Sequence, residues 1–332
     1  MRRCAFSILT AVAMTLGDIC LADAYPVEIT HRYGTAQIIE KPTRVVSLSY
    51  IGHDFLLSLE VVPVALRKWY GSDPYGVWPW GHDALGDATP IVMQGEIDIE
   101  RIALLEPDLI VGQWSGMSAR DYALLSRIAP TIAPAAGAGD YGMSWQDMLR
   151  TLALATDTTD KADTIIAELD GRFAAIRAAH PDWQGASAVM VWAGQTGAYT
   201  DRDIRGQFLN ELGFVVPQAV NDMGTLENFY AIIPPEDISP IDADVLVWID
   251  GGGSIGQLER MPLRPLMRAY REGREVYADP MLSAALSHSS PLSINYALDR
   301  LVPLIAAAAD GDPATVVPSA RDAGILPPEV EG

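Results

Sequence analysis

The chain has 332 residues, of which 49% are hydrophobic and 20% charged, so it can form two globular domains and is not a disordered chain. Its formal net charge of −20 would be repelled by phosphate, which excludes nucleic acid as a partner and suits a basic protein surface.

Residues 1–24 have the pattern of a secretory signal peptide. A basic start at residues 1–3 precedes an apolar run, and small residues at Ala22 and Ala24 predict cleavage near Ala24, before Tyr25. The run of about 13 apolar residues is too short to span a membrane. We therefore expect an exported, periplasmic protein.

Both cysteines, Cys4 and Cys20, lie inside this leader. The mature chain is therefore expected to form neither a disulfide nor a thiolate metal site. The residues before Cys20 are Gly17-Asp18-Ile19, a poor lipoprotein box, so lipidation of Cys20 stays open as the less favoured alternative.

An N-terminal α/β lobe is predicted over residues 25–146. The segment 25–39 alternates as an edge strand or hairpin does. Buried strands are predicted at 44–48, 61–66, 91–92, 108–111 and 131–134. Helices are predicted between them at 53–59, from Asp98 onward, and at 118–128. Because strand alternates with helix, we expect a parallel sheet. The segment 67–86 is irregular and rich in aromatic residues.

A helical region at 147–182 interrupts this alternation and contains the expected linker helix. Its apolar residues, from Ala162 to Ile176, recur at three- and four-residue steps and mark one buried face. A C-terminal α/β lobe is predicted over 183–310, with strands at 187–192, 244–249 and 275–277 and helices at 206–212 and 293–309. The Pro-rich tail, 311–332, is expected to pack loosely. The predicted fold is thus two Rossmann-like α/β lobes bridged by one long helix.

Two stretches of the chain share one spacing. Glu100 stands eight residues before Asp108, and Glu236 stands eight before Asp244. Each aspartate introduces a strand that is apolar enough to be buried, so the match supports two similar lobes. Taken alone, each glutamate would be interpreted as a first-turn acid that complements a helix dipole, worth about 0.3–1 kcal/mol.

The glycines of Gly251-x-Gly253-x-x-Gly256 match a dinucleotide fingerprint, and Asp279 lies where a ribose-binding acid would be expected. However, prolines at 262 and 265 interrupt the helix that should begin at the third glycine. We therefore interpret this segment as a flexible loop at the carboxyl end of a strand.

The chain's five histidines give no sign of a metal site. None lies two to four residues from another, so no direct metal site is predicted. His288 has serines on both sides, but the chain lacks a Gly-x-Ser-x-Gly nucleophile elbow, so no catalytic residue is predicted.

Aromatic residues gather where predicted strands end. Trp114, Trp192 and Trp248 lie at or near the carboxyl ends of strands, the edge that faces the ligand crevice in an open α/β sheet. With Arg67 and Arg205 nearby, such rings would suit a bulky ligand that is partly aromatic and partly anionic.

In combination, several segments resemble the periplasmic substrate-binding proteins of iron-siderophore and vitamin B12 ABC importers. They are KPTRVVSL (41–48), IDIERI (97–102), EPDLI (106–110), IAPT (128–131), FLNELGF (208–214) and SPLSI (290–294). The similarity covers roughly residues 26–308. Trp78-Pro79-Trp80 and the aromatic loop around it bring the chain nearest to the ferric-siderophore branch.

The resemblance implies a ligand cleft between the lobes with little hinge motion. It implies a monomeric, non-enzymatic receptor without cofactor, which binds iron only as a siderophore chelate and delivers it to an inner-membrane ABC permease. Glutamates that dock into permease arginines map onto Glu100 and Glu236. The cleft candidates are Trp69, Tyr70, Trp114, Met117, Trp192, Phe229, Tyr230 and Trp248, with Arg67 and Arg205.

Two alternatives remain open at this point. The same fold could bind haem or a corrinoid, with a tyrosine or histidine as the axial ligand of a haem. An exported hydrolase that degrades the chelate is the other alternative. The sequence leaves hydroxamate, catecholate and citrate chelates open, although it lacks the clustered arginines that would suit a highly charged catecholate.

Overall fold

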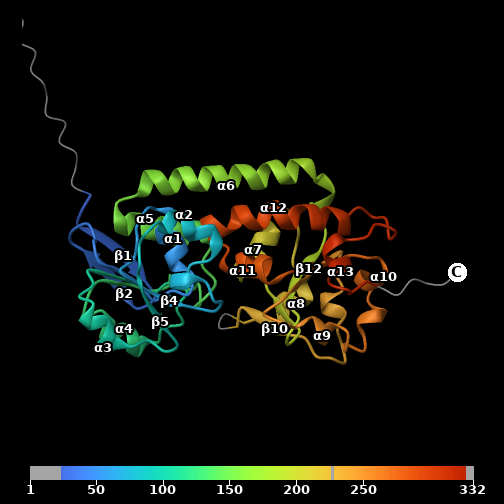
Figure 1. The fold of residues 1–332 in the computed structure, drawn as a ribbon, viewed down its shortest axis with the longest axis horizontal. Helices are drawn as coiled ribbons and strands as arrows, with labels where there is room; N and C mark the ends of the chain where they lie inside the picture. The colour runs from blue at the N-terminus through green and yellow to red at the C-terminus, as the bar shows by residue number, and fades with distance from the viewer. Residues whose placement is uncertain (1–23, 226–227, 327–332) are drawn as a thin grey trace, which may run out of the picture.

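Two five-stranded sheets form the cores of two lobes that lie side by side and are spanned by helix α6 (Thr159–Ala179) (Figure 1). The computed structural model describes residues 24–225 and 228–326, so the expected leader and Cys20 lie outside the described residues. Within the described ranges, no helix is both long and apolar enough to cross a membrane.

The segment that follows the expected leader forms the predicted hairpin. Strands β1 (Val27–His31) and β2 (Gly34–Ile38) pair in antiparallel register, and alternate side chains of β1 are buried. β1 contacts helix α5 (Trp145–Thr156), which also packs on α1 (Gly52–Ser58) of the first lobe, so the hairpin covers one side of that lobe.

The first sheet is entirely parallel, in the order β5-β4-β3-β6-β7, as expected from the alternation of strand and helix. Its strands are β3 (Val45–Ser47), β4 (Ala65–Lys68), β5 (Ile91–Gln94), β6 (Leu109–Val111) and β7 (Thr131–Ile132). Its helices are α1 (Gly52–Ser58), α2 (His82–Leu85), α3 (Ile99–Leu104) and α4 (Ala119–Leu125). The second strand begins at Ala65 rather than at residue 61, because β4 is the segment that pairs with β3 and β5.

The second sheet has the order β10-β9-β8-β11-β12 and is mixed. Its strands are β8 (Ala188–Trp192), β9 (Gly197–Tyr199), β10 (Tyr230–Ile232), β11 (Val245–Ile249) and β12 (Glu275–Ala278). β9 is antiparallel to both of its neighbours, so β10 runs in the same direction as β8. The sequence pattern did not predict β9 or β10, since three residues are too few to show an alternation.

The matched aspartates occupy equivalent positions in the two lobes. Asp108 accepts hydrogen bonds from the Thr43 and Arg44 backbone N–H groups at 2.7 and 2.8 Å, directly before β3. Asp244 accepts them from the Ser187 backbone N–H at 3.0 Å and hydroxyl at 2.8 Å, directly before β8. β6 pairs with β3 as β11 pairs with β8, so each aspartate fixes the start of the neighbouring central strand.

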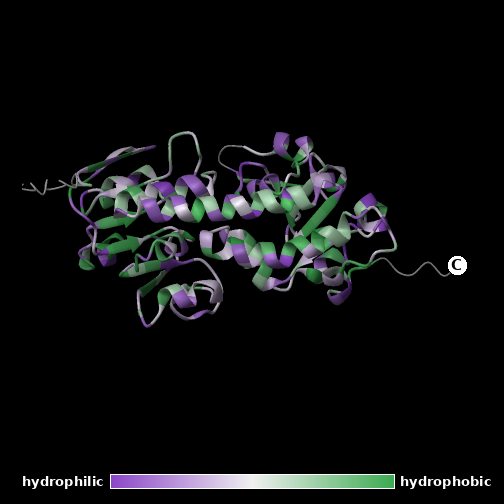
Figure 2. Cartoon of the chain, turned by 90° about the horizontal axis from the view of Figure 1, so that it is seen from above, coloured by the Kyte–Doolittle hydropathy of each residue, from purple (hydrophilic) through white to green (hydrophobic). Residues whose placement is uncertain are grey.

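The helical region at 147–182 consists of two helices rather than one. α5 (Trp145–Thr156) ends at Asp157, whose left-handed backbone (φ 55°) stops the helix. α6 (Thr159–Ala179) then runs for 21 residues across both lobes (Figure 1). Its buried residues, Ala162, Ile166, Leu169 and Phe173, follow the predicted face. Seen from above, hydrophilic and hydrophobic residues are interspersed along the long helices (Figure 2).

The remaining helices belong to the second half of the chain. They are α7 (Ile204–Glu211), α8 (Gln218–Met223), α9 (Ile255–Leu258), α10 (Arg268–Arg271), α11 (Pro280–His288), α12 (Pro291–Ala308) and α13 (Pro318–Asp322). The prediction of a loosely packed tail is wrong for its described part. α13 packs on β12, and Val317, Ala320 and Ile325 are buried.

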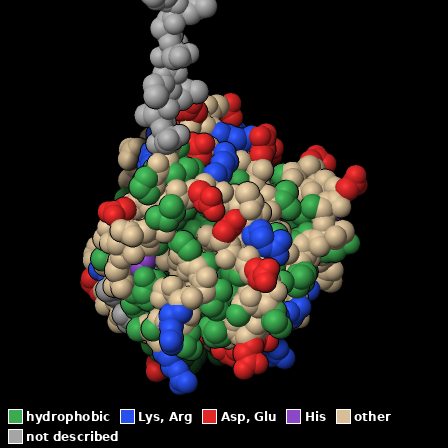
Figure 3. All heavy atoms as spheres, turned by 90° about the vertical axis from the view of Figure 1, so that its left-hand side faces the viewer, with side chains coloured by type: hydrophobic (Ala, Val, Ile, Leu, Met, Phe, Trp, Pro, Cys, Tyr) green, Lys and Arg blue, Asp and Glu red, His purple; other side chains and the backbone are tan. Residues whose placement is uncertain are grey.

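A buried hydrogen-bond junction joins the lobes. The Asp54 carboxylate on α1 accepts from the Trp80 indole N–H at 2.7 Å and from the Ser290 hydroxyl at 2.8 Å. Ser290 is the N-cap of α12, which contacts α1 as well as α6. The first lobe therefore holds the start of the second lobe's longest helix. At the end face of the first lobe, acidic and basic side chains are interspersed (Figure 3).

Candidate functional site

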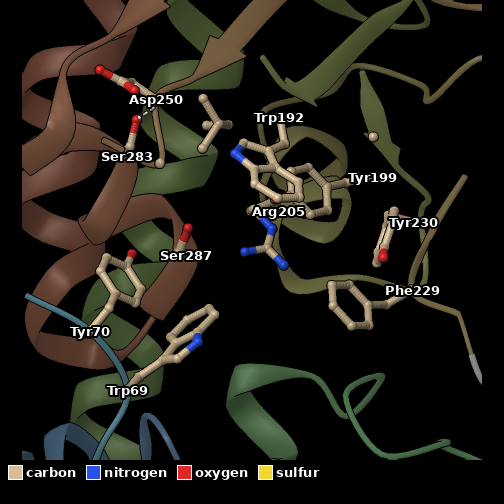
Figure 4. Close-up of a pocket in the computed structure, with 13 residues that line it drawn as sticks. Trp69, Tyr70, Trp192, Tyr199, Arg205, Phe229, Tyr230, Asp250, Ser283 and Ser287 are labelled. Atoms are coloured by element: carbon tan, nitrogen blue, oxygen red, sulfur yellow. Dashed lines mark hydrogen bonds between the residues drawn. The ribbon is translucent and has the colours of Figure 1, made fainter. Parts of the chain in front are cut away.

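Residues of both lobes line a cavity of about 360 Å³ (Figure 4). Six of the ten cleft candidates border it, namely Trp69, Tyr70, Trp192, Arg205, Phe229 and Tyr230. The first two belong to the first lobe and the other four to the second. The cavity thus lies where the predicted cleft between the lobes was expected.

The position of the cavity follows from the topology of the two sheets. Trp69 and Tyr70 follow the carboxyl end of β4, Trp192 ends β8, and Asp250 follows β11. The carboxyl ends of parallel strands share one edge of a sheet, and ligand crevices of open α/β sheets form there. Both lobes therefore present this edge to the same cavity.

Arg205 brings a charged group to the cavity, but its charge is matched locally. Its Nε and Nη2 donate to the two Asp203 carboxylate oxygens at 2.7 and 2.9 Å, and both side chains are buried. Asp203 also caps α7 by accepting from the Arg205 backbone N–H. The guanidinium stacks 3.7 Å from the centre of the Tyr199 ring. Burial lowers the pKa of Arg205, but the Asp203 carboxylate together with the Tyr199 and Tyr70 hydroxyls outweighs burial and raises the pKa above its usual value.

The glycine-rich loop after β11 is organised by Asp250. Its Oδ1 accepts from the backbone N–H groups of Gly252 and Ser254 at 2.8 and 3.0 Å, and its Oδ2 accepts from the Tyr277 hydroxyl at 2.6 Å. Burial raises the pKa of Asp250, but these hydrogen bonds and a further one from the Ser254 hydroxyl at 2.7 Å together outweigh burial and leave the pKa below its usual value. The carboxylate points away from Arg205 (Figure 4). The following helix, α9, has four residues, so the loop lacks the long helix of a dinucleotide site.

Four candidates from the sequence do not line the cavity, and two of these are core residues. Met117 is 2% exposed and packs against Gly112. Trp248 is fully buried and donates its indole N–H to Glu275 at 2.9 Å. The prediction that these two side chains face the ligand is therefore corrected.

The other two, Trp114 and Arg67, lie behind the lining residues. Trp114 packs edge-on against Trp69 at 5.3 Å between ring centres and is 2% exposed. Arg67 donates to the Gly95 and Ser115 carbonyls at 2.9 and 3.0 Å. Both support the aromatic wall from behind and have no surface in the cavity.

The sequence reasoning missed several lining residues, among them Tyr199 on β9 and Ser283 and Ser287 on α11. A signal for α11 was present, because an aspartate followed by proline, Asp279-Pro280, is a typical helix start. The two serines are four residues apart and thus share one face of that helix.

His53 and His288 are buried between the lobes, with ring centres 6.3 Å apart. The His288 ring lies 5.8 Å from that of Trp69, directly behind the cavity wall. Across residues 24–225 and 228–326, no group of three or more His, Cys, Asp or Glu side chains is arranged to hold a metal ion.

Buried His288 makes stability depend on pH. Burial lowers the pKa of His288 to about 4; Asp54 opposes this, while His53 and Arg205 add to it. Between pH 4 and pH 6.5 the unfolded chain binds a proton that the folded chain does not, so the free energy of unfolding falls as pH falls. From this group we expect a loss of about 3 kcal/mol between pH 7 and pH 4. Denaturant unfolding measured across this pH range should show that the free energy of unfolding of His288→Asn changes less with pH than that of the wild type. An equal dependence on pH in the two proteins would contradict the role of His288.

The two glutamates lie at equivalent places on the lobes. Glu100 is exposed in the first turn of α3, which follows β5, the edge strand of the first sheet. Glu236 is exposed in a turn after β10, the edge strand of the second sheet. Because β10 runs parallel to β8, both glutamates follow carboxyl strand ends, the sheet edge at which the cavity residues also lie. The interpretation of Glu236 as a helix-dipole acid is wrong, since no helix begins there.

Comparisons with known proteins agree with this geometry. A family model described as "Periplasmic binding protein" matches residues 45–282. A Bacillus subtilis protein described as "Probable siderophore-binding lipoprotein YfiY" is 30% identical over 227 residues, which cover 66% of this chain and 67% of that protein.

Solved structures show the same likeness. A periplasmic solute binding protein from Mycobacterium smegmatis has 32% identity and a TM-score of 0.74, covering 84% of this chain and 97% of that one. PiaA from Streptococcus pneumoniae, in complex with ferrichrome, has 26% identity and a TM-score of 0.73, covering 86% and 99%.

Proposed function

The chain belongs to the family of periplasmic binding proteins, and we propose that it captures a ferric siderophore and delivers it to an inner-membrane ABC importer. The observation that carries this proposal is the cavity between the lobes, lined by six aromatic rings and one arginine. Burying a bulky chelate against such rings contributes about 25 cal/mol per Å² of apolar surface. The serine and arginine groups would orient the chelate. Iron enters only as part of this cargo.

A fluorescence titration tests this function. Trp69 and Trp192 border the cavity, so a bound ferric chelate should quench tryptophan emission along a saturable curve. A flat titration with hydroxamate, catecholate and citrate chelates would contradict the proposal. Binding of haem with a Soret band, or release of a degraded chelate, would favour the two alternatives instead.

Trp192 is expected to supply a large share of the affinity. Replacing it by alanine removes an aromatic wall, and losing such a buried contact costs about 1.5–3 kcal/mol, or about 10- to 100-fold in Kd. The matched control is Trp183→Phe, because Trp183 stacks on Phe214 and His180 inside the second lobe, away from the cavity. Equilibrium titration should show weakened binding for the first variant alone.

Docking to the permease belongs to the same proposal. Glu100 and Glu236 would contact arginines of the permease, one from each lobe, as the resemblance implies. The geometry supports this docking role: both glutamates are exposed, follow equivalent edge strands, and lie on the side of the cavity. The receptor would act in the periplasm as a monomer, after cleavage of the leader before Tyr25, and would bind its ligand without turnover.

A further inference from the structure

The charges around the cavity cancel. Arg205 lines it and is paired with Asp203, while Asp250 lines it with its carboxylate held by the loop. Of the residues that line the cavity, only Arg205 and Asp250 carry formal charges, and these two charges sum to zero. Because Asp203 pairs with Arg205 behind the wall, no net positive charge faces the cavity.

The arginine at the cavity still offers a directed donor. Nε and Nη2 of Arg205 are both engaged by Asp203, and no hydrogen bond from Nη1 to another described residue is present. The guanidinium faces the space between Tyr70, Trp192 and Phe229 (Figure 4). It can donate to a ligand oxygen without adding net charge to the cavity.

The net charge of a ferric chelate depends on its chemical class. Three hydroxamates carry three negative charges and neutralise Fe³⁺, whereas three catecholates carry six and leave a net charge of −3. Placing such an anion in a neutral, aromatic cavity removes its hydration without a compensating positive charge. We propose, resting on the proposed function, that the cavity selects ferric chelates of zero net charge, of the trihydroxamate class, and rejects ferric tricatecholates.

The test compares chelates of the two classes on the full mature chain. Ferrichrome, a neutral trihydroxamate, and a ferric tricatecholate are titrated at low and high salt. We expect ferrichrome to bind at least about a hundredfold more tightly, with a Kd that changes little with salt because the ligand has no net charge. Equal or tighter binding of the tricatecholate overturns the inference but leaves the receptor function standing. Binding of neither chelate nor of ferric citrate contradicts the receptor function itself.

A charge variant makes the test specific. Asp203→Asn keeps a good helix N-cap for α7 and leaves Arg205 uncompensated. The preference for ferrichrome should then shrink about tenfold or more. Ser287→Lys, which adds a positive charge to the wall without altering Asp203, should shift the ratio of the two Kd values in the same direction. If neither variant changes the ratio, cavity charge does not set the selectivity.

A second observation concerns exposed apolar side chains. Among the described residues, three large hydrophobic side chains are more than 60% exposed: Ile39 at 69%, Leu104 at 84% and Leu266 at 67%. Leu104 lies on α3, four residues after Glu100 and therefore on the same face of that helix. Leu266 and Glu236 line the same surface hollow, of about 210 Å³, with Leu263. Each docking glutamate thus has an exposed leucine beside it.

We infer that Leu104 and Leu266 are apolar anchors of the permease contact, next to the charged pair. The inference rests on the proposed docking role of the glutamates. A charge next to an apolar side chain matches a partner surface that places arginines beside an apolar pocket, and burying one leucine contributes about 10- to 100-fold to affinity.

The double variant Leu104→Ser with Leu266→Ser should lower uptake of the ferric chelate at least about tenfold and leave its Kd for the purified protein unchanged. Ile39→Ser is the matched control, since Ile39 is equally exposed but follows β2, on the hairpin. Uptake at the wild-type rate in the double variant, or an equal loss in the control, overturns the inference. If reversing both glutamates also leaves uptake intact, the docking role itself fails.

Discussion

Reversing both docking charges, as Glu100→Arg with Glu236→Arg, is expected to abolish uptake of the ferric chelate and leave its affinity for the purified protein intact. The substitution would place like charges opposite the permease arginines, which costs several kcal/mol. We therefore expect uptake to fall on the order of a hundredfold. Both side chains are exposed in the free protein, so the fold should tolerate the change.

The matched control for this experiment is Glu168→Arg. Glu168 is also exposed but lies on α6, on the opposite side of the molecule from α3 and β10 (Figure 1). Its reversal should leave uptake unchanged. If affinity fell together with uptake in the double variant, the two glutamates would act on ligand binding or stability, and the docking role would be wrong.

Replacing Asp54 by alanine is expected to lower the free energy of unfolding by about 2–5 kcal/mol. Asp54 is fully buried, and its removal leaves the Trp80 indole N–H and the Ser290 hydroxyl without their acceptor. Each buried donor left unpaired costs about 1–3 kcal/mol. Because Ser290 caps α12, the loss should also loosen the contact between the lobes.

Denaturant unfolding measures this change, with Asp54→Asn as the control. The asparagine keeps an oxygen acceptor for Trp80 and Ser290, so it should lose less stability than the alanine variant. An alanine variant as stable as the wild type, within about 0.5 kcal/mol, would show that the junction does not hold the lobes together.

Much of the fold could be predicted because its elements carry local signals. The buried strands of the first lobe appear as apolar runs, and the Asp98 N-cap marks the start of α3. The shared spacing that ends at Asp108 and Asp244 reflects equivalent positions in the two lobes, since each carboxylate accepts a backbone hydrogen bond at the start of a neighbouring strand. β9 and β10 escaped prediction because each has three residues, too few to show an alternation of buried and exposed side chains.

Sequence patterns could not predict which of the strand-end residues line the cavity. Trp192 and Trp248 both lie at strand ends, yet only the first lines the cavity. In the sheet, Trp192 stands beside Ile249, which also lines the cavity, whereas Trp248 stands beside Val191. Neighbouring residues of a strand point to opposite faces, so Trp248 faces the core. The pairing of β8 with β11 therefore determines which tryptophan faces the cavity, and no local sequence pattern reveals this pairing.

The most direct test of the central claim is native mass spectrometry of the mature protein mixed with equimolar ferrichrome, a ferric tricatecholate, ferric citrate and haem. We expect one ferric chelate bound per chain, with ferrichrome as the occupant and little occupancy in the Trp192→Ala variant. Binding of haem alone, or no bound iron compound, would contradict it.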